Sequence, residues 1–276
     1  MKLEQPVQEA LLRLAVAAGV EIEKVRRQDI TVFDKEDNSP VTQADFNAHA
    51  CIARGVAELP LQLPLLSEEG ADPLAAYKEA WPAYWLVDPL DGTKEFIAGN
   101  GEYTVNIALV VEGRATFGVV YAPAKQLLYW GGAHYGAYRA QLDGQEGGEL
   151  HLAGLAATPI TVRTPSKPVV CLGSRRHGGE AKTALLEAMQ AQWQQVVEEK
   201  LGSSLKLCRV AEGKADIYPR FGPTSEWDIA AGQAVLEGAG GRVWTQQCKP
   251  LCYRRSNVIN PDFYALGGSE EDWRWL

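Results

Sequence analysis

The segment Trp85-Leu86-Val87-Asp88-Pro89-Leu90-Asp91-Gly92-Thr93-Lys94-Glu95-Phe96 organises the rest of the chain. Its first half is a short apolar run that ends in a carboxylate, which predicts a buried strand delivering Asp88 to the strand's carboxyl edge. Pro89 lacks a backbone N–H and fixes φ, so we expect it to end the strand and start a turn. Asp91 then returns to the same side as Asp88, and two carboxylates converge on one point.

Two converging carboxylates in a buried site need a charge partner. Buried anions at close range cannot both stay ionised unless cations neutralise them, and the alternatives are a shared proton or full exposure. Mg²⁺ suits this arrangement because it takes oxygen ligands from a few carboxylates and keeps its other positions for water and substrate phosphate. The Leu90 carbonyl, fixed between the two aspartates, is a further candidate ligand. A strand followed by a solvated Asp-Gly turn is the alternative interpretation.

The residues that follow the two aspartates predict an anion site. Gly92 permits close approach of the backbone, and Thr93 opens a short helix whose N–H groups attract phosphate oxygens. We therefore expect a metal site and a phosphate site to lie side by side.

Composition excludes several classes of protein. The chain has 276 residues, enough for one large domain or two modest ones. Its formal net charge of −8 argues against a surface for nucleic-acid polymers, which needs clustered Lys and Arg, although a single nucleotide stays compatible. The sequence predicts no transmembrane segment and no signal peptide. We expect a cytoplasmic protein, with peripheral attachment at the inner membrane and homo-oligomer formation left open.

The first half of the chain predicts helices and an antiparallel sheet. Apolar residues recur at helical spacing from 7 to 25, and an apolar strand is expected at 61–66. Short β-prone segments broken by glycines follow from 103 to 139, including one at 123–126. Close strands joined by tight turns predict an antiparallel meander.

The second half of the chain has a different pattern. After Pro165, strands and helices alternate, which favours a mostly parallel sheet with helices on its faces. The change in pattern places a boundary near 158–168, and we divide the chain into residues 1–163 and 164–276.

Three further carboxylates are candidates for the same site, and each has a purely structural alternative. Asp45 lies three residues after Thr42, as in a helix capping box, so it is either an active-site group or a helix-start carboxylate. Glu68 follows the strand before Asp88, and adjacent strands would bring their ends together. Asp228 begins a helix and could be favoured there by the helix dipole alone, or it could supply a third aspartate for a second cation.

The order of these segments resembles the signature of the inositol monophosphatase superfamily. The matching segments are Ser39-Pro40-Val41-Thr42-x-Ala44-Asp45, Ser67-Glu68-Glu69, Asp88 to Thr93, and Trp227-Asp228-x-Ala230-Ala231-Gly232. The resemblance implies a five-layered αβαβα sandwich of the mixed α/β class. Lys94-Glu95-Phe96 is similar to the bacterial 3′(2′),5′-bisphosphate nucleotidases, because inositol phosphatases usually carry Thr-Asn-Phe there.

The resemblance also implies roles for individual residues. One Mg²⁺ would be held by Glu68, Asp88 and the Leu90 carbonyl, and another by Asp88, Asp91 and Asp228. The implied catalytic residues are Asp45, Glu68 and Thr93, with Thr93 hydrogen-bonded to Asp45. The implied substrate contacts are Glu68, Asp91, Gly92, Thr93, Lys94 and Asp228.

The activity implied by the resemblance is Mg²⁺-dependent, lithium-sensitive removal of the 3′-phosphate from 3′-phosphoadenosine 5′-phosphate, a product of sulfate activation. An inositol or sugar monophosphatase is the enzymatic alternative. A nucleotide- or phosphate-sensing protein without turnover is the alternative of another class. The cations available for a second substrate phosphate are Lys94, Lys206, Arg220 and Arg175.

Overall fold

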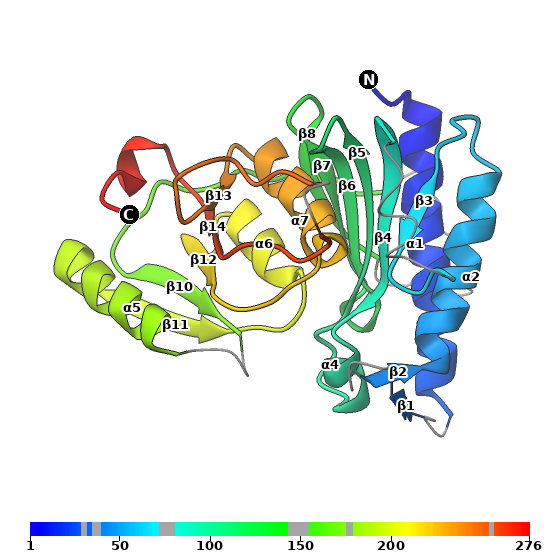
Figure 1. Cartoon of the computed structure of the whole chain (residues 1–276), viewed down its shortest axis with the longest axis horizontal. Helices are drawn as coiled ribbons and strands as arrows, with labels where there is room; N and C mark the ends of the chain where they lie inside the picture. The colour runs from blue at the N-terminus through cyan, green and yellow to red at the C-terminus, as the bar shows by residue number, and fades with distance from the viewer. Residues whose placement is uncertain (29–31, 35–39, 72–80, 143–154, 175–178, 254–256) are drawn as a thin grey trace.

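The described elements of the chain alternate between helices and sheets in five layers (Figure 1). The computed structural model describes residues 1–28, 32–34, 40–71, 81–142, 155–174, 179–253 and 257–276. Among these residues the strands form a seven-stranded sheet, a five-stranded sheet and a two-stranded β1-β2 ladder. The predicted αβαβα sandwich is therefore confirmed. Arg175 and the loop at 143–148 lie outside the described residues.

Two helices form the first outer layer, and the second begins at the capping box that the sequence predicts. In α1 (Gln5–Arg26), Pro6 occupies the first turn, where its missing N–H costs nothing. Before α2 (Gln43–Ala57), the Thr42 and Asp45 side chains form a reciprocal capping box. The apolar faces of both helices pack against one face of the seven-stranded sheet (Figure 1).

The seven-stranded sheet contains the predicted meander. Strands β4 to β9 pair antiparallel in chain order, and β3 pairs parallel with β4 at the other edge. The bounds are β3 Leu65–Ser67, β4 Ala83–Asp91, β5 Thr104–Val111, β6 Arg114–Ala122, β7 Leu127–Gly132, β8 Gly136–Gln141 and β9 Thr158–Pro159, with β1 Val32–Asp34 and β2 Pro40–Thr42 outside this sheet. The segment predicted as β-prone at 123–126 is instead a 3₁₀ helix, η1 (Pro123–Lys125), because Pro123 favours a tight turn between β6 and β7.

The strand that carries the aspartates differs from the prediction at Pro89. We expected Pro89 to end the strand, but β4 continues to Asp91 and its pairing with β5 shifts register between Asp88 and Asp91. A bulge of this kind accommodates proline because the bulged residues leave the hydrogen-bond ladder. Both carboxylates are thus held by one strand, on either side of the bulge.

The middle layer consists of α6 (Leu205–Ala211) and α7 (Glu226–Gly238), which lie between the two sheets (Figure 1). Helix α7 packs directly on β4 to β8. Gly118 in β6 makes this close approach feasible, because a Cβ atom at this position would lie 2.2 Å from the carbonyl oxygen of Ala231. The start of α7 is thereby fixed against the sheet that carries Asp88.

The five-stranded sheet is mixed, which corrects the expectation of a mostly parallel sheet. Strand β10 pairs parallel with β11 and β12, whereas β14 pairs antiparallel with β12 and β13. Between β13 and β14 the described chain contains no helical crossover, so β14 returns antiparallel to its neighbour. The bounds are β10 Val169–Gly173, β11 Val196–Lys200, β12 Ile217–Arg220, β13 Arg242–Thr245 and β14 Phe263–Leu266.

Helix α5 (Glu180–Trp193) forms the last layer, on the outer face of this sheet (Figure 1). The C-terminal turn η2 (Glu271–Trp273) joins the same core: the Trp273 ring is fully buried and its Nε1–H donates to the Gly267 carbonyl at 2.5 Å. The tryptophan-rich end of the chain therefore packs on its own fold.

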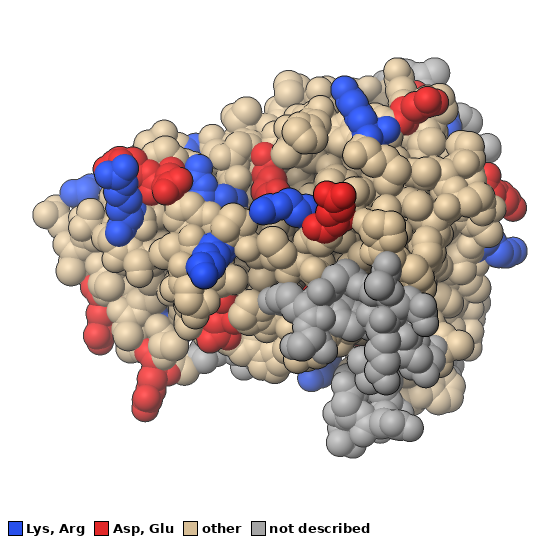
Figure 2. Space-filling model, turned by 45° about the horizontal axis from the view of Figure 1, so that its top comes forward, with Lys and Arg blue, Asp and Glu red and all other residues tan. Residues whose placement is uncertain are grey.

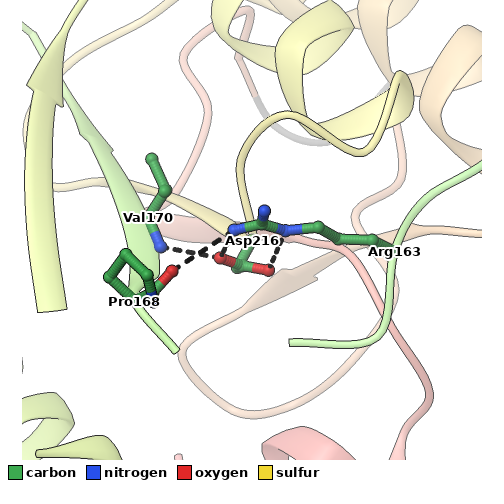
Figure 3. Close-up of polar contacts among 4 residues, drawn as sticks. All are labelled: Arg163, Pro168, Val170 and Asp216. Carbon is green, nitrogen blue, oxygen red and sulfur yellow. Dashed lines mark hydrogen bonds and ion pairs between the residues drawn. The ribbon is translucent and has the colours of Figure 1, made fainter. Parts of the chain in front are cut away.

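A buried ion pair fixes the segment that joins the two sheets (Figure 3). The fully buried Asp216 accepts two hydrogen bonds from Arg163, from Nε at 2.8 Å and from Nη2 at 2.5 Å, and a third from the Val170 N–H at 2.6 Å. The pair ties the connecting segment to the first strand of the five-stranded sheet. The division of the chain at 163/164 stays a prediction. Helix α7, from the second part, packs on the sheet of the first part, so the two parts share a core.

Candidate active site

The site begins where two parallel strand ends meet. Strands β3 and β4 run in parallel with Ser67 opposite Val87, and the Glu68 N–H donates to the Val87 carbonyl at 3.1 Å. Glu68 and Asp88 therefore leave the same edge of the sheet, as predicted from their positions at the ends of adjacent strands. Asp88 is buried, and its Oδ1 accepts a hydrogen bond from the Leu90 N–H at 3.0 Å.

Helix α7 adds a third carboxylate from the second half of the chain. Asp228 caps the first turn of α7, where its Oδ2 accepts the Ser225 N–H at 3.0 Å. One oxygen from each of Glu68, Asp88 and Asp228 lies within 4.8 Å of the others. The structure thus brings together three of the predicted metal ligands, two from strand ends and one from a helix start.

The electrostatics of this cluster fit a divalent cation. Burial, followed by repulsion from Glu68 and Asp91, raises the pKa of Asp88 well above its usual range. Burial and repulsion from Asp91 and Glu68 likewise raise the pKa of Asp228. The donor set consists of carboxylate oxygens, which Mg²⁺, Mn²⁺ and Ca²⁺ prefer. A bound cation would remove the repulsion that these carboxylates exert on each other.

Asp91 lies beside the three-carboxylate cluster and is not one of its members. Its Oδ2 accepts the backbone N–H of Ser204 at 2.5 Å, and burial raises the pKa of Asp91 to about 6, against attraction from Lys206. Its predicted role as a ligand of a second cation stays a prediction.

The Asp45 carboxylate accepts hydrogen bonds from two residues. Its Oδ2 accepts the Thr42 N–H at 2.7 Å and the Thr42 hydroxyl at 2.8 Å, which is the helix cap. Its Oδ1 accepts the hydroxyl of Thr93 at 3.1 Å. Burial raises the pKa of Asp45, and the hydrogen bonds from Thr42 and Thr93 oppose that shift. The two interpretations of Asp45 are therefore compatible, because each carboxylate oxygen has a different partner.

The turn after Asp91 has the backbone expected of a close anion contact. Gly92 adopts φ +93°, a conformation that favours glycine, and a Cβ atom there would lie 3.1 Å from the Glu102 carbonyl oxygen. Helix α4 (Thr93–Ile97) follows, and Lys94 is exposed at the wall of a cavity. The Leu90 side chain packs in the core on the helical side of the seven-stranded sheet.

A cavity of about 220 Å³ joins these residues to the second half of the chain. Asp91, Gly92 and Asp228 line it, together with Lys206 and Arg220. Leu201, Leu207 and Ile229 add an apolar portion to the wall. The cavity therefore has both polar and apolar lining residues and is bordered by two buried cations.

Lys206 is held by neutral groups. Its Nζ donates to the main-chain carbonyls of Leu201 at 3.2 Å and Ser203 at 2.6 Å, and lies 5.1 Å from the centre of the Tyr218 ring. Burial lowers the pKa of Lys206 to about 8, with attraction from Asp91 opposing the change. The side chain is therefore mostly charged at pH 7.

Arg220 is fixed in the same way. Its guanidinium donates to the Ser174 hydroxyl at 3.0 Å and to the main-chain carbonyls of Gly222 and Pro223 at 3.3 and 2.5 Å. The sequence placed Lys206 and Arg220 among the available cations but could not show that both are buried at one cavity. It missed the buried polar residues Thr104, Asn106 and Ser204 behind Asp91, although Thr104 and Asn106 interrupt the apolar face of a strand.

Comparison with known proteins agrees with this architecture. The profile of the inositol monophosphatase family matches residues 3–271. The chain therefore belongs to the inositol monophosphatase family of phosphatases, and the metal dependence of that family fits the acidic cluster.

Several relatives of this chain within the family are named 3′(2′),5′-bisphosphate nucleotidases. The chain is 44% identical over 233 residues to the 3′(2′),5′-bisphosphate nucleotidase CysQ of Shigella flexneri, covering 84% of this chain and 87% of the relative. Among solved structures, CysQ from Bacteroides thetaiotaomicron aligns with a TM-score of 0.82 at 37% identity, covering 95% of this chain and 97% of that one. The Thermotoga maritima IMPase shares the fold at 22% identity, with a TM-score of 0.74 and coverage of 96% and 93%.

Proposed function

We propose that this chain is a Mg²⁺-dependent phosphatase that hydrolyses the 3′-phosphate of 3′-phosphoadenosine 5′-phosphate to give AMP and phosphate. The observation that carries the proposal is a cavity lined by Asp91, by Asp228 of the three-carboxylate cluster, and by two buried cations. The relatives named 3′(2′),5′-bisphosphate nucleotidase support the choice of substrate.

The clustered carboxylates would hold the cations. Glu68, Asp88 and Asp228 converge on one point, and Asp91 and the Leu90 carbonyl complete the proposed ligand set. When bound, the cations supply neutralisation of charge on the attacking and leaving oxygens of the phosphate.

Thr93 and Asp45 would orient the attacking water. The Thr93 hydroxyl donates a hydrogen bond to Asp45. The lone pairs of its oxygen are therefore available to accept a hydrogen bond from a water molecule. Asp45, whose pKa is raised by burial, can then accept the proton through Thr93. The backbone around Gly92 and the Lys94 side chain would hold the phosphate in line with that water.

The second phosphate of the substrate separates this activity from its closest alternative. A 3′,5′-bisphosphate carries a dianion remote from the reacting centre, whereas inositol 1-phosphate carries none. Lys206 and Arg220 offer fixed positive charge to that dianion, and each charge-assisted contact contributes about 1.5–3 kcal/mol. The bisphosphate should therefore be preferred by about 10² to 10⁴ in kcat/KM.

The substrate class also fits the rest of the molecule. Within the described residues, no helix is both long enough and apolar enough to cross a membrane. On the face shown in Figure 2, Lys and Arg side chains are scattered and mostly lie near Asp or Glu, unlike the continuous basic stripe of a polymer-binding surface. A cytoplasmic location and a small-molecule substrate remain part of the proposal.

The deciding experiment compares three substrates side by side by phosphate release: 3′-phosphoadenosine 5′-phosphate, 3′-AMP and inositol 1-phosphate. Lys206→Met should lower kcat/KM for the bisphosphate by at least tenfold and change that for 3′-AMP much less. Lys24→Met, at an exposed lysine of α1, is the matched control. Equal hydrolysis of inositol 1-phosphate by the unmodified chain would favour the inositol monophosphatase alternative, and absence of turnover on all three would favour a sensor.

A further inference from the structure

Three buried side chains form a polar chain behind the carboxylates of the proposed metal site. Thr104 and Asn106 lie on β5 and are fully buried, and Ser204, at the start of α6, is 2% exposed. The Ser204 hydroxyl lies 2.8 Å from the Thr104 hydroxyl and 2.7 Å from the Asn106 Oδ1. Since Asn106 Oδ1 can only accept, Ser204 donates to it and Thr104 donates to Ser204.

This chain is in contact with Asp91 through the backbone. The Ser204 N–H donates to Asp91 Oδ2 at 2.5 Å, and the Ser204 carbonyl accepts the first hydrogen bonds of α6. The amide, hydroxyl and carbonyl groups of Ser204 thus each bond to a different part of the fold. Ser204, from the second half of the chain, is held by β5 and in turn holds the Asp91 carboxylate on β4.

Asn106 also faces the second carboxylate of β4. Asn106 pairs directly with Asp88 across the β4-β5 ladder, and directly opposed residues project their side chains on the same face. Among the described residues, no group accepts a hydrogen bond from the Asn106 Nδ2. A fully buried amide nitrogen without an acceptor is costly, which calls for an acceptor that the site supplies.

We propose that Asn106, held in place by Ser204 and Thr104, is a positioning residue that donates its unused amide hydrogen to the Asp88 carboxylate in the metal-loaded enzyme. Through this bond and the Ser204 N–H to Asp91, one polar chain sets the spacing between the two aspartates of β4. The inference rests on the proposed metal site. It assigns Asn106 a role in metal affinity, with no contact to the substrate.

Alternative roles for these residues make different predictions. If Asn106 only filled space, an apolar side chain of the same size would keep metal binding intact. Partners of metal ligands typically change metal affinity or activity by 10- to 100-fold when they are removed. The affinity of the substrate-free protein for a cation therefore distinguishes the two roles.

The test measures Mn²⁺ binding to the substrate-free protein by the loss of the free-ion electron paramagnetic resonance signal, together with the Mg²⁺ concentration for half-maximal activity. Asn106→Leu should weaken both by at least tenfold while the KM for substrate at saturating Mg²⁺ changes less than threefold. Ser204→Ala keeps the backbone N–H to Asp91 and should show a smaller loss in the same direction.

Gln233→Met is the matched control. Gln233 is a buried amide of α7 that donates to the Leu251 carbonyl at 3.0 Å and accepts from the Tyr253 hydroxyl, away from the cavity lining. The Gln233→Met substitution should lower the melting temperature and leave Mn²⁺ affinity unchanged. Unaltered Mn²⁺ affinity in a folded Asn106→Leu variant would overturn the inference.

Asp91→Asn separates this inference from the proposed function. Loss of Mn²⁺ binding in Asp91→Asn with normal binding in Asn106→Leu would refute the positioning role alone. Normal Mn²⁺ binding in Asp91→Asn would refute the proposed ligand set itself. If Asn106→Leu fails to fold, the Mn²⁺ affinity of Ser204→Ala tests the inference: weakened binding supports it and unaltered binding overturns it.

Discussion

At the scale of single residues, Asp45 shows how one side chain can have a structural and a chemical role. One oxygen closes the capping box of α2 and the other accepts the Thr93 hydroxyl. Replacing Asp45 would therefore disturb both the helix and the site. Thr93 is the better residue for testing the chemical role, because its hydroxyl caps no helix.

Thr93→Ala should lower kcat by about 10² or more while KM for substrate changes much less, because the lost hydroxyl orients the attacking water. Steady-state kinetics at saturating Mg²⁺ measure this. Thr93→Ser, which keeps the hydroxyl, should recover most of the rate. A Thr93→Ala variant with normal turnover would leave Asp45 with the capping role alone.

Asp91 should make the metal-free protein less stable as pH rises. Its pKa is raised from about 3.8 to about 6, so its contribution favours folding below the lower value and is lost as pH rises through the upper one. In EDTA, Asp91→Asn should therefore gain in melting temperature relative to the unmodified chain between pH 4 and pH 7. We expect a relative gain of roughly 3 °C or more by calorimetry, since one kcal/mol corresponds to about 2–4 °C in a chain of this size. A constant difference across this pH range would contradict the assignment.

Residues could be predicted from the sequence where their neighbours along the chain define the environment. Asp88 and Asp91 were identifiable because a short apolar run and a turn surround them. Asn106 and Ser204 were missed because their role depends on two segments about 100 residues apart, which one-dimensional patterns do not relate. A polar residue on the buried face of a strand was the available signal at Asn106.

At the scale of elements, most helices and strands followed from hydrophobic periodicity, and the differences have local causes. Strand β4 passes through Pro89 because a bulge removes the need for its N–H. Strand β11 was not predicted, since Val196-Val197-Glu198-Glu199-Lys200 is mostly exposed at a sheet edge and has little apolar pattern. Pairing directions in the five-stranded sheet depend on long connections that the sequence does not describe.

The ion pair in Figure 3 should stabilise the junction between the two sheets. Asp216→Asn removes the buried negative charge that pairs with Arg163 and accepts the Val170 N–H. Breaking a buried ion pair lowers the free energy of unfolding by about 3–5 kcal/mol. We expect roughly 3 kcal/mol, because the Arg163 side chain is 33% exposed and can partly rehydrate. The melting temperature should fall by about 6–12 °C.

A control for this prediction is Glu271→Gln, which breaks an exposed pair with Arg274 in which both side chains are more than 60% exposed. That substitution should change stability by less than about 1 kcal/mol. Equal melting temperatures for the two variants would show that the buried pair contributes little to the junction.

At the scale of the whole molecule, the metal site joins layers that are distant in the sequence. Glu68 and Asp88 come from the seven-stranded sheet, and Asp228 comes from the middle helical layer. Cation binding should therefore stabilise the packing of these layers as well as enable catalysis. The fold class was predictable because the family resemblance covers these same segments.

Removal of divalent cations should abolish activity, and Li⁺ should inhibit the Mg²⁺-loaded enzyme because its single charge is insufficient to release phosphate. Phosphate release measured in excess EDTA, then with Mg²⁺ restored, tests the first statement. Activity that persists in EDTA would refute metal dependence in this chain. Turnover unaffected by millimolar Li⁺ would place it outside the lithium-sensitive members of the family.

The geometry of the active site depends on Gly118, although Gly118 is not a metal ligand. Helix α7 lies so close to β6 that one methyl group at residue 118 would overlap the backbone of Ala231, less than one helical turn after Asp228. Overpacking of this kind costs about 1–3 kcal/mol or shifts the backbone, so Gly118→Ala should weaken Mn²⁺ binding in the measurement described above. A residue that touches no cation would thereby set how well the protein holds one.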